Sequence, residues 1–260
     1  MGVLNETYAT LRVRSEEDIH FIQIHRPDAG NAINGQLIKE LAAALRRSET
    51  DAKILVLEGL PEVFCSGADF KDIESQLATG SQHPGQDPEP LYELWYRLAS
   101  GPCLTVAHVR GRANAGGIGF IAACDVVLSE EKAAFSLSEL LFGLLPACVL
   151  PFLIRRIGFA RANYMTLTTQ PITARQAEQW GLVDVCEANS ENLLRKQLLR
   201  LRRLGKDGVA RYKRYACSVD DALTAARPKA LQANIEVFSD PGNLQKIARY
   251  VRTGKFPWEA

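Results

Sequence analysis

The stretch VAHVRGRANAGGIGFIAACD, residues 106–125, decides the fold. It begins as an apolar strand, passes through a turn of small residues and continues as an apolar helix. Such a turn leaves free backbone N–H groups at a helix N-terminus, where they can bind negative charge. A second turn, FCSGADF at residues 64–70, follows the apolar run 53–58. Two strand-to-helix turns that each present backbone donors could together bind a developing oxyanion.

The rest of the N-terminal half repeats the same order of elements. Alternating residues predict paired strands at 11–14 and 19–25, and helical spacing follows at 36–46. Further short strands are expected at 126–129 and 134–137. This alternation predicts an α/β fold whose sheets are largely covered by helices.

Two other segments have a different character. The polar, Gly- and Pro-rich stretch 75–90 is expected to be a mobile flap over a site. After residue 184 only helices are expected, so we divide the chain into a core, 1–194, and a helical region, 195–260. Segment 195–206 is a basic amphipathic helix. It is either a solvated face over a stripe of leucines or a docking patch for an acidic partner.

The composition excludes several classes of protein. The chain has 260 residues, of which 47% are hydrophobic and 23% charged, values typical of a globular protein. A net charge of +1 gives no drive toward nucleic acid or a membrane surface. The longest apolar stretch, 140–154, is interrupted by glycine and proline and is too short to span a bilayer. Nothing at the N-terminus suggests export, so a cytoplasmic protein is expected.

Cysteine and histidine spacing argues against metal binding. The six cysteines contain no C-x-x-C pair, and the four histidines do not cluster with them. In a chain of this length that pattern fits neither a disulfide framework nor a structural zinc site. Residues 117–122 fit G-x-G-x-x-A, but their helix can run only to about residue 125, so a dinucleotide is not expected. We expect no metal and no bound cofactor.

Several ordered motifs resemble the crotonase (enoyl-CoA hydratase/isomerase) superfamily, over residues 21–258. Besides the two turns, they are HRPDAGNAIN at 25–34, the block from Phe135 to Pro146 around Glu139, and PITARQAEQWGLV at 171–183. The resemblance implies a spiral of ββα repeats with a C-terminal helical region for trimer assembly. It also implies that the Ala68 and Gly116 N–H groups hold the carbonyl of an acyl-CoA or acyl-phosphopantetheine thioester and stabilise an enolate. The residues expected to contact the thioester carrier are Ala29, Ala68, Asp69, Phe70 and Gly116.

One departure from the family pattern narrows the chemistry. Hydratases of this superfamily carry one carboxylate in the helix after the glycine turn and another at the position of Glu139. Here the first position is Gly119. A single carboxylate fits an elimination or a 1,3-proton shift, and its place beside an apolar run is expected to raise its pKa. Asn114 either orients the leaving hydroxyl or caps its own turn, and His108 is either a second acid or a core histidine.

A narrower resemblance covers residues 59–65, 135–144, 146–158 and the ending YVRTGKFPWE at 250–259. It is to the dehydratases of polyketide β-branching cassettes. It implies dehydration of 3-hydroxy-3-methylglutaryl-acyl carrier protein to 3-methylglutaconyl-acyl carrier protein, before a decarboxylating crotonase homologue acts.

The implied partners are the acyl carrier protein and further copies of the chain, in a homotrimer or a dimer of trimers. A cation should bind the distal carboxylate of the substrate, and Lys71, His83 and Arg97 are candidates. A single-carboxylate isomerase, hydrolase or decarboxylase remains an alternative, as does a catalytically silent thioester-binding homologue.

Overall fold

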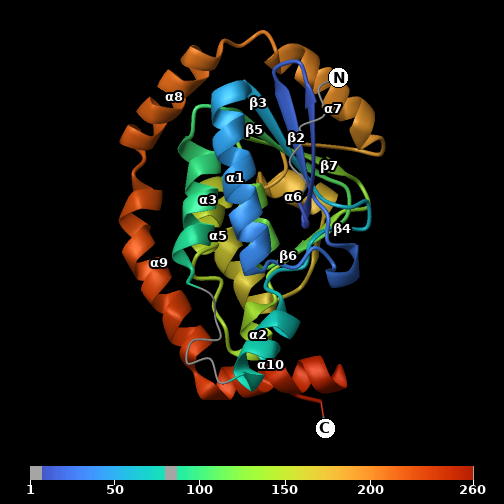
Figure 1. Ribbon diagram of the computed structural model, residues 1–260, viewed down its shortest axis with the longest axis vertical. Helices are drawn as coiled ribbons and strands as arrows, with labels where there is room; N and C mark the ends of the chain where they lie inside the picture. The colour runs from blue at the N-terminus through green and yellow to red at the C-terminus, as the bar shows by residue number, and fades with distance from the viewer. Residues whose placement is uncertain (1–7, 80–86, 260) are drawn as a thin grey trace.

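Two β-sheets form the centre of the computed structural model, which describes residues 8–79 and 87–259 (Figure 1). The larger sheet has the strand order β1-β2-β3-β5-β7-β10. β1 and β2 pair antiparallel, as predicted, and the other neighbours are parallel. Its strands are β1 (Leu11–Glu16), β2 (Ile19–Ile24), β3 (Ile54–Glu58), β5 (Leu104–Val109), β7 (Val126–Glu130) and β10 (Val185–Glu187).

The smaller sheet is built from very short strands in the order β4-β6-β8-β9. β4, β6 and β8 are parallel, and β9 pairs antiparallel with β8. The strands are β4 (Val63–Cys65), β6 (Arg112–Asn114), β8 (Ala134–Ser136) and β9 (Ile172–Thr173). The sequence analysis treated the first two of these as parts of turns, because three residues are too few to show an alternating pattern.

Successive ββα units connect the two sheets. In each unit the first strand joins the larger sheet and the second joins the smaller one, and a helix follows: β3-β4-α2, β5-β6-α4 and β7-β8-η2. These helices are α2 (Phe70–Ala78), α4 (Gly116–Ala123) and the 3-10 helix η2 (Glu139–Phe142). The expected crotonase-like spiral is confirmed. Because β4, β6 and β8 are parallel neighbours, the segments that leave their C-terminal ends converge at one edge.

The remaining helices cover both faces of the larger sheet. On one face α7 places Leu193, Leu194 and Leu198 against the sheet residues Ile54 and Val106. The other face packs against the main core with α1, α3, α4 and α5. The helices not yet given bounds are η1 (Pro27–Ala29), α1 (Gly35–Asp51), α3 (Glu89–Ser100), α5 (Leu150–Thr168), α6 (Ala174–Trp180), α7 (Ser190–Leu201), α8 (Lys206–Val219), α9 (Ala222–Ser239) and α10 (Pro241–Thr253).

Two expectations about the elements of the chain need correction. A strand, β10, does follow residue 184. It was missed because only Cys186 of its three residues is buried and its pairing with β7 is long-range. Helix α10 falls within the region 195–260 that was expected to be helical. The polar stretch 75–90 is less of a loop than expected, since 75–78 belong to α2 and α3 begins at Glu89. Residues 80–86 lie outside the described part of the chain.

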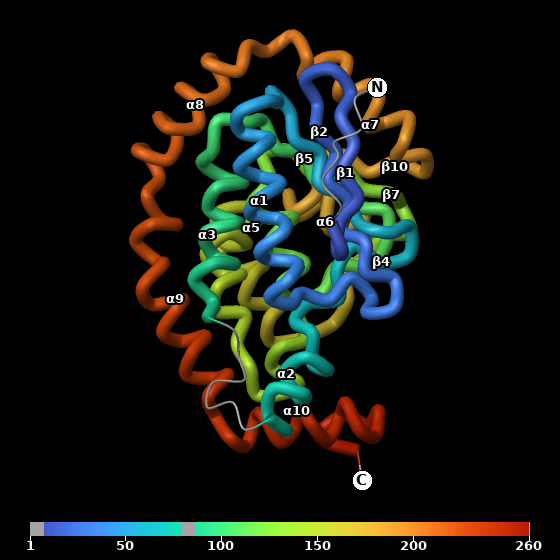
Figure 2. Tube along the Cα trace, viewed as in Figure 1, coloured from blue at the N-terminus to red at the C-terminus, as the bar shows by residue number. Residues whose placement is uncertain are grey.

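The C-terminal helices wrap around the molecule. α8 and α9 run alongside α3 and α5 from one end to the other, and α10 then lies against α2 (Figure 2). The basic helix predicted at 195–206 ends at Leu201; its Leu198 is buried on the sheet, whereas Leu199 is exposed. The expected boundary at residue 195 falls within α7, so the division into core and helical region stays a prediction. Within the described residues, no helix is long and apolar enough to cross a membrane.

Candidate active site

A cavity of about 850 Å³ lies where the segments after β4, β6 and β8 converge. The structure brings together along its wall all the residues that the sequence analysis assigned to the site. They are Ala29, Ala68, Asp69, Phe70, Asn114, Gly116 and Glu139.

The two small-residue turns touch each other. Gly67 has φ +96°, and a Cβ built on it would lie 2.8 Å from the Cβ of Ala115 and 3.8 Å from the N atom of Gly116. Only glycine allows this conformation together with such a close approach. The turn of residues 64–70 and the turn before α4 are therefore parts of one backbone arrangement.

The two predicted donor groups are free to bind a ligand. Ala68 forms a β-bridge with Ile33, but the hydrogen bonds of this bridge are made by its neighbours: the Ile33 N–H donates to the carbonyl of Gly67, and the Asp69 N–H donates to the carbonyl of Ile33. The N–H of Ala68 therefore points away from Ile33. Gly116 is the first residue of α4, and its N–H has no acceptor within the helix. Within the described residues, neither N–H group donates to a protein acceptor. Two unpaired donors beside one cavity can bind an oxyanion.

Ala115 holds the second donor in place through a strained conformation. Its φ is +51° and its ψ −123°, outside the regions that a residue with a Cβ normally occupies. Its own N–H donates to the carbonyl of Ser136 in β8. Strain of this kind costs about 1–3 kcal/mol and is concentrated at functional sites.

Glu139 supplies the carboxylate of the site. It begins η2, immediately after β8, and lines the cavity. Its Oε2 is buried and has no hydrogen-bond partner within the described structure. Burial raises the pKa of Glu139 to about 7, against the opposing effect of hydrogen bonds from the backbone of Glu139 and Ser138. A carboxyl group with this pKa exchanges protons readily near neutral pH.

The position of the missing second carboxylate is filled by an indole ring. A Cβ on Gly119 would lie 2.5–2.7 Å from three ring atoms of Trp95, which comes from α3 and lines the cavity. Trp95 is itself fixed by edge-to-face contacts with Phe120 and Phe152. Gly119 is therefore required by packing, and no side chain fits there while Trp95 holds its place.

Comparison with known proteins agrees with this geometry. The pattern of the enoyl-CoA hydratase/isomerase family matches residues 14–260. The chain is 53% identical over 254 residues to the bacillaene synthase dehydratase PksH of Bacillus subtilis (strain 168), covering 97% of this chain and 98% of that protein. The chain belongs to the enoyl-CoA hydratase/isomerase family.

Other relatives support the same assignment. A crystal structure of PksH from Bacillus subtilis superimposes with a TM-score of 0.94 at 52% identity, covering 96% of this chain and 100% of that one. The 2,3-dehydroadipyl-CoA hydratase of Escherichia coli (strain K12) is 35% identical over 177 residues, 66% of this chain and 67% of that protein. Both the expected crotonase membership and the fold are confirmed, and the chain is a hydro-lyase of this family.

Asn114 lies on the wall of the same cavity, in a polar network. Its Nδ2 donates to Ser138 Oγ at 2.8 Å and to the carbonyl of Ser66 at 3.3 Å, and its Oδ1 accepts from Ser136 Oγ at 2.9 Å. Asn114 Oδ1 still has a lone pair that can accept another hydrogen bond, and the Ser138 hydroxyl still has its own proton to donate. The two serines line the cavity but were missed from the sequence, where no motif distinguishes them.

Three of the expected carrier-binding residues, Ala68, Asp69 and Phe70, lie where α2 begins. Asp69 caps α2 by accepting from the N–H of Asp72 at 3.2 Å and forms an ion pair of 2.9 Å with Arg26. Asp69 is therefore a helix-capping carboxylate. Phe70 packs edge-to-face against Phe142, with ring centroids 5.0 Å apart, within an aromatic cluster that includes Tyr250 of α10. The C-terminal helix thereby forms one wall of the cavity.

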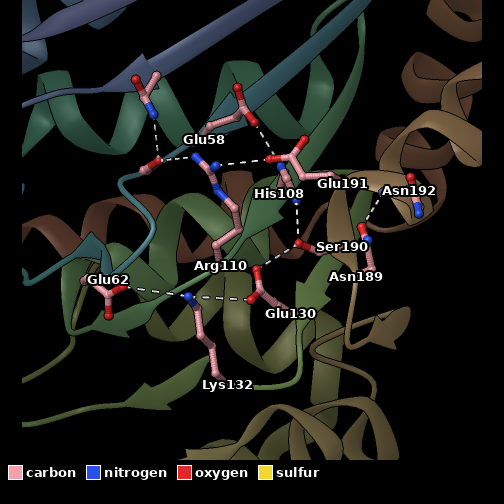
Figure 3. Close-up of polar contacts among 12 residues, drawn as sticks. Glu58, Glu62, His108, Arg110, Glu130, Lys132, Asn189, Ser190, Glu191 and Asn192 are labelled. Atoms are coloured by element: carbon pink, nitrogen blue, oxygen red, sulfur yellow. Dashed lines mark hydrogen bonds and ion pairs between the residues drawn. The ribbon is translucent and has the colours of Figure 1, made fainter.

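The structure separates two other candidates, His108 and Arg97, from the site. His108 is buried outside the cavity, where Nδ1 lies 2.9 Å from Glu58 Oε1 and Nε2 lies 3.0 Å from Ser190 Oγ (Figure 3). It is a core histidine and not a second acid. Arg97 does not line the cavity and is paired with Glu49. Lys71 does line it, and His83 lies outside the described residues.

One group of side chains has the composition of a metal site. Ligand atoms of Glu58, His108 and Glu191 lie within 4.8 Å of one another. However, both ring nitrogens of His108 are already hydrogen-bonded, and Arg110 contacts Glu191 at 3.1 Å (Figure 3). Because the guanidinium already supplies positive charge there, the cluster is a network of ion pairs that joins the start of α7 to the larger sheet.

Proposed function

We propose that this enzyme dehydrates 3-hydroxy-3-methylglutaryl-acyl carrier protein to 3-methylglutaconyl-acyl carrier protein. The observation that carries the proposal is one buried carboxylate, Glu139, beside two free backbone donors, with Trp95 in the place of a second carboxylate. The likeness to PksH, a dehydratase of bacillaene synthase, supports a role in polyketide biosynthesis.

The geometry suggests how the elimination would proceed. The thioester oxygen accepts hydrogen bonds from the N–H groups of Ala68 and Gly116, which acidifies the α-carbon and stabilises the enolate. Ionised Glu139 removes the α-proton. As the enolate collapses to the enoyl thioester, the bond between C3 and the hydroxyl breaks and the proton on Glu139 passes to the departing hydroxide, so that one water is lost.

Asn114 would hold the leaving hydroxyl. The free lone pair of its Oδ1 can accept from that hydroxyl, while the Ser138 hydroxyl, held by Asn114 at 2.8 Å, can donate to it. Since protein groups supply both the oxyanion donors and the base, the proposed reaction uses no metal and no cofactor besides the phosphopantetheine or CoA of the substrate.

The carrier protein would dock at the end of the molecule that bears α2 and α10. Residues of both helices line the cavity, whereas the basic helix α7 lies at the opposite end (Figure 1). A patch on α7 is too remote to deliver a tethered substrate to the cavity of the same chain. We further propose a homotrimer or a dimer of trimers, a decarboxylating crotonase homologue as the next enzyme, and a cytoplasmic location. The six free cysteines are in keeping with a reducing compartment.

Mass spectrometry of carrier protein loaded with 3-hydroxy-3-methylglutarate tests the proposal. Loss of one water supports it, and the Glu139→Gln variant should then leave the substrate unchanged. Loss of carbon dioxide would instead identify a decarboxylase, and release of free acid a hydrolase. If wild-type protein binds the loaded carrier but leaves it unchanged, the chain is a silent homologue and the proposal is wrong.

A further inference from the structure

Positive charge is scarce on the wall of the cavity. Among the described residues that line it, only Lys71 and Arg112 are cationic. Arg112 is not one of the cations named from the sequence; it is exposed, and its side chain makes no hydrogen bond or ion pair with the described part of the protein. An unpaired guanidinium on a cavity wall is available to a ligand.

Arg112 lies on the same side of the small sheet as the polar network of the site. It begins β6, two residues before Asn114, and alternation along the strand directs the intervening Ala113 into the core. β8 pairs Ser136 with Asn114 on this face. A strand advances about 3.3 Å per residue, so Arg112 lies within about 13 Å of the oxyanion donor Gly116 along the chain. A five-carbon acyl group and an arginine side chain can together span that distance.

The surroundings of the two cations differ. The lining residues at the start of α2 and just before α3 include the carboxylates Asp69, Asp72 and Asp87, and Lys71 is the neighbour of Asp72. These carboxylates disfavour a second negative charge on the ligand in that part of the cavity. Around Arg112, by contrast, the other lining residues of β4, β6 and β8 are uncharged, and the neighbouring Glu62 is exposed and pairs with Lys132 at 3.7 Å.

We propose that the Arg112 guanidinium binds the distal carboxylate of the acyl group and thereby selects a dicarboxylic acyl thioester. The identity of that acyl group rests on the proposed function. A planar guanidinium can bind a carboxylate through two parallel hydrogen bonds, which a lysine cannot do. The thioester carbonyl is then fixed at Ala68 and Gly116 and the far end at Arg112, which sets the α-carbon between them beside Glu139.

The contact between Arg112 and the distal carboxylate can be tested by the binding of two thioesters that cannot eliminate water. Glutaryl-pantetheine and butyryl-pantetheine differ only in the distal carboxylate, and neither has a hydroxyl group to eliminate. Calorimetric titration of wild-type protein, Arg112→Gln, Arg112→Lys and the matched control Lys71→Gln would give a dissociation constant for each ligand. Thermal unfolding of each variant would show that the fold is retained.

We expect Arg112→Gln to weaken glutaryl-pantetheine binding by about 10- to 100-fold, the usual effect of losing a charge-assisted hydrogen-bonded pair, and to leave butyryl-pantetheine binding unchanged. Arg112→Lys should restore part of the loss, and Lys71→Gln should not change the ratio between the two ligands. An unchanged ratio in Arg112→Gln, or a loss of the ratio only in Lys71→Gln, overturns the inference. Because neither ligand can eliminate water, these outcomes do not depend on whether the enzyme proves to be a dehydratase.

Discussion

Replacement of Glu139 by glutamine should make the protein more stable, and increasingly so as the pH rises. Glutamine has nearly the same shape as a glutamate side chain but cannot ionise. In the folded protein, burial raises the pKa of Glu139 from an ordinary value of 4.5 to about 7. The stabilising effect of protonated Glu139 is therefore complete below pH 4.5, falls between pH 4.5 and about 7, and is absent above.

The size of the effect follows from linkage between protonation and folding. A rise in pKa from 4.5 to about 7 corresponds to about 3 kcal/mol, at about 1.4 kcal/mol per pH unit. The free energy of unfolding of Glu139→Gln minus that of wild type should therefore increase by about 3 kcal/mol between pH 4.5 and pH 8. The catalytic activity of Glu139→Gln should instead be lower than that of wild type, because glutamine cannot accept the α-proton.

Urea unfolding at a fixed protein concentration, repeated across this pH range, measures the difference. The exposed Glu236 of α9, exchanged for glutamine in the same way, reports what the loss of one negative charge does by itself. A difference between Glu139→Gln and wild type that does not change with pH would refute the desolvated carboxyl group at the site. So would a difference that becomes smaller as the pH rises.

Three further perturbations test other parts of the site. Gly119→Ala should lower the free energy of unfolding by about 1–3 kcal/mol, because its Cβ would overlap the Trp95 ring, and chemical denaturation that shows no loss would count against this packing. Ala115→Gly should raise the melting temperature by a few degrees in calorimetry, since it relieves the φ of +51°; a fall would show that the conformation is not strained. Tyr250→Ala should cost about 3–5 kcal/mol of stability and weaken thioester binding, as α10 would lose its ring contact with Phe142 at 5.2 Å; unchanged binding by the folded variant would exclude α10 from the carrier site.

The parts of the fold that could be predicted are those with a strong local signal. The central strands of the larger sheet are runs of mostly buried residues, as in β3, where all five residues are buried. The conformation of the glycine turns could be predicted from the sequence, because only glycine tolerates the φ and the close contact found at Gly67. The very short strands β4, β6 and β10 could not be predicted, since their hydrogen bonds come from distant segments and not from their own sequence.

The residues of the candidate site divide in the same way, into those with a local sequence signal and those without one. Ala68, Gly116 and Glu139 were found because each belongs to a family motif that follows the second strand of a ββα unit. Trp95 was missed, because its relation to Gly119 depends on how α3 packs against α4. Arg112 was missed for a similar reason, as an exposed arginine in a turn-like sequence shows nothing of the cavity that it lines.

In the proposed mechanism one carboxylate, Glu139, removes the α-proton of a thioester that is held by two backbone N–H groups. Exchange of the α-hydrogens of glutaryl-pantetheine in D2O, followed by mass spectrometry, measures that step without the later elimination. Wild-type protein and Asn114→Ala should both incorporate deuterium, whereas Glu139→Gln should incorporate it no faster than buffer alone. Deuterium uptake by Glu139→Gln at the wild-type rate would show that Glu139 is not the base that removes the α-proton.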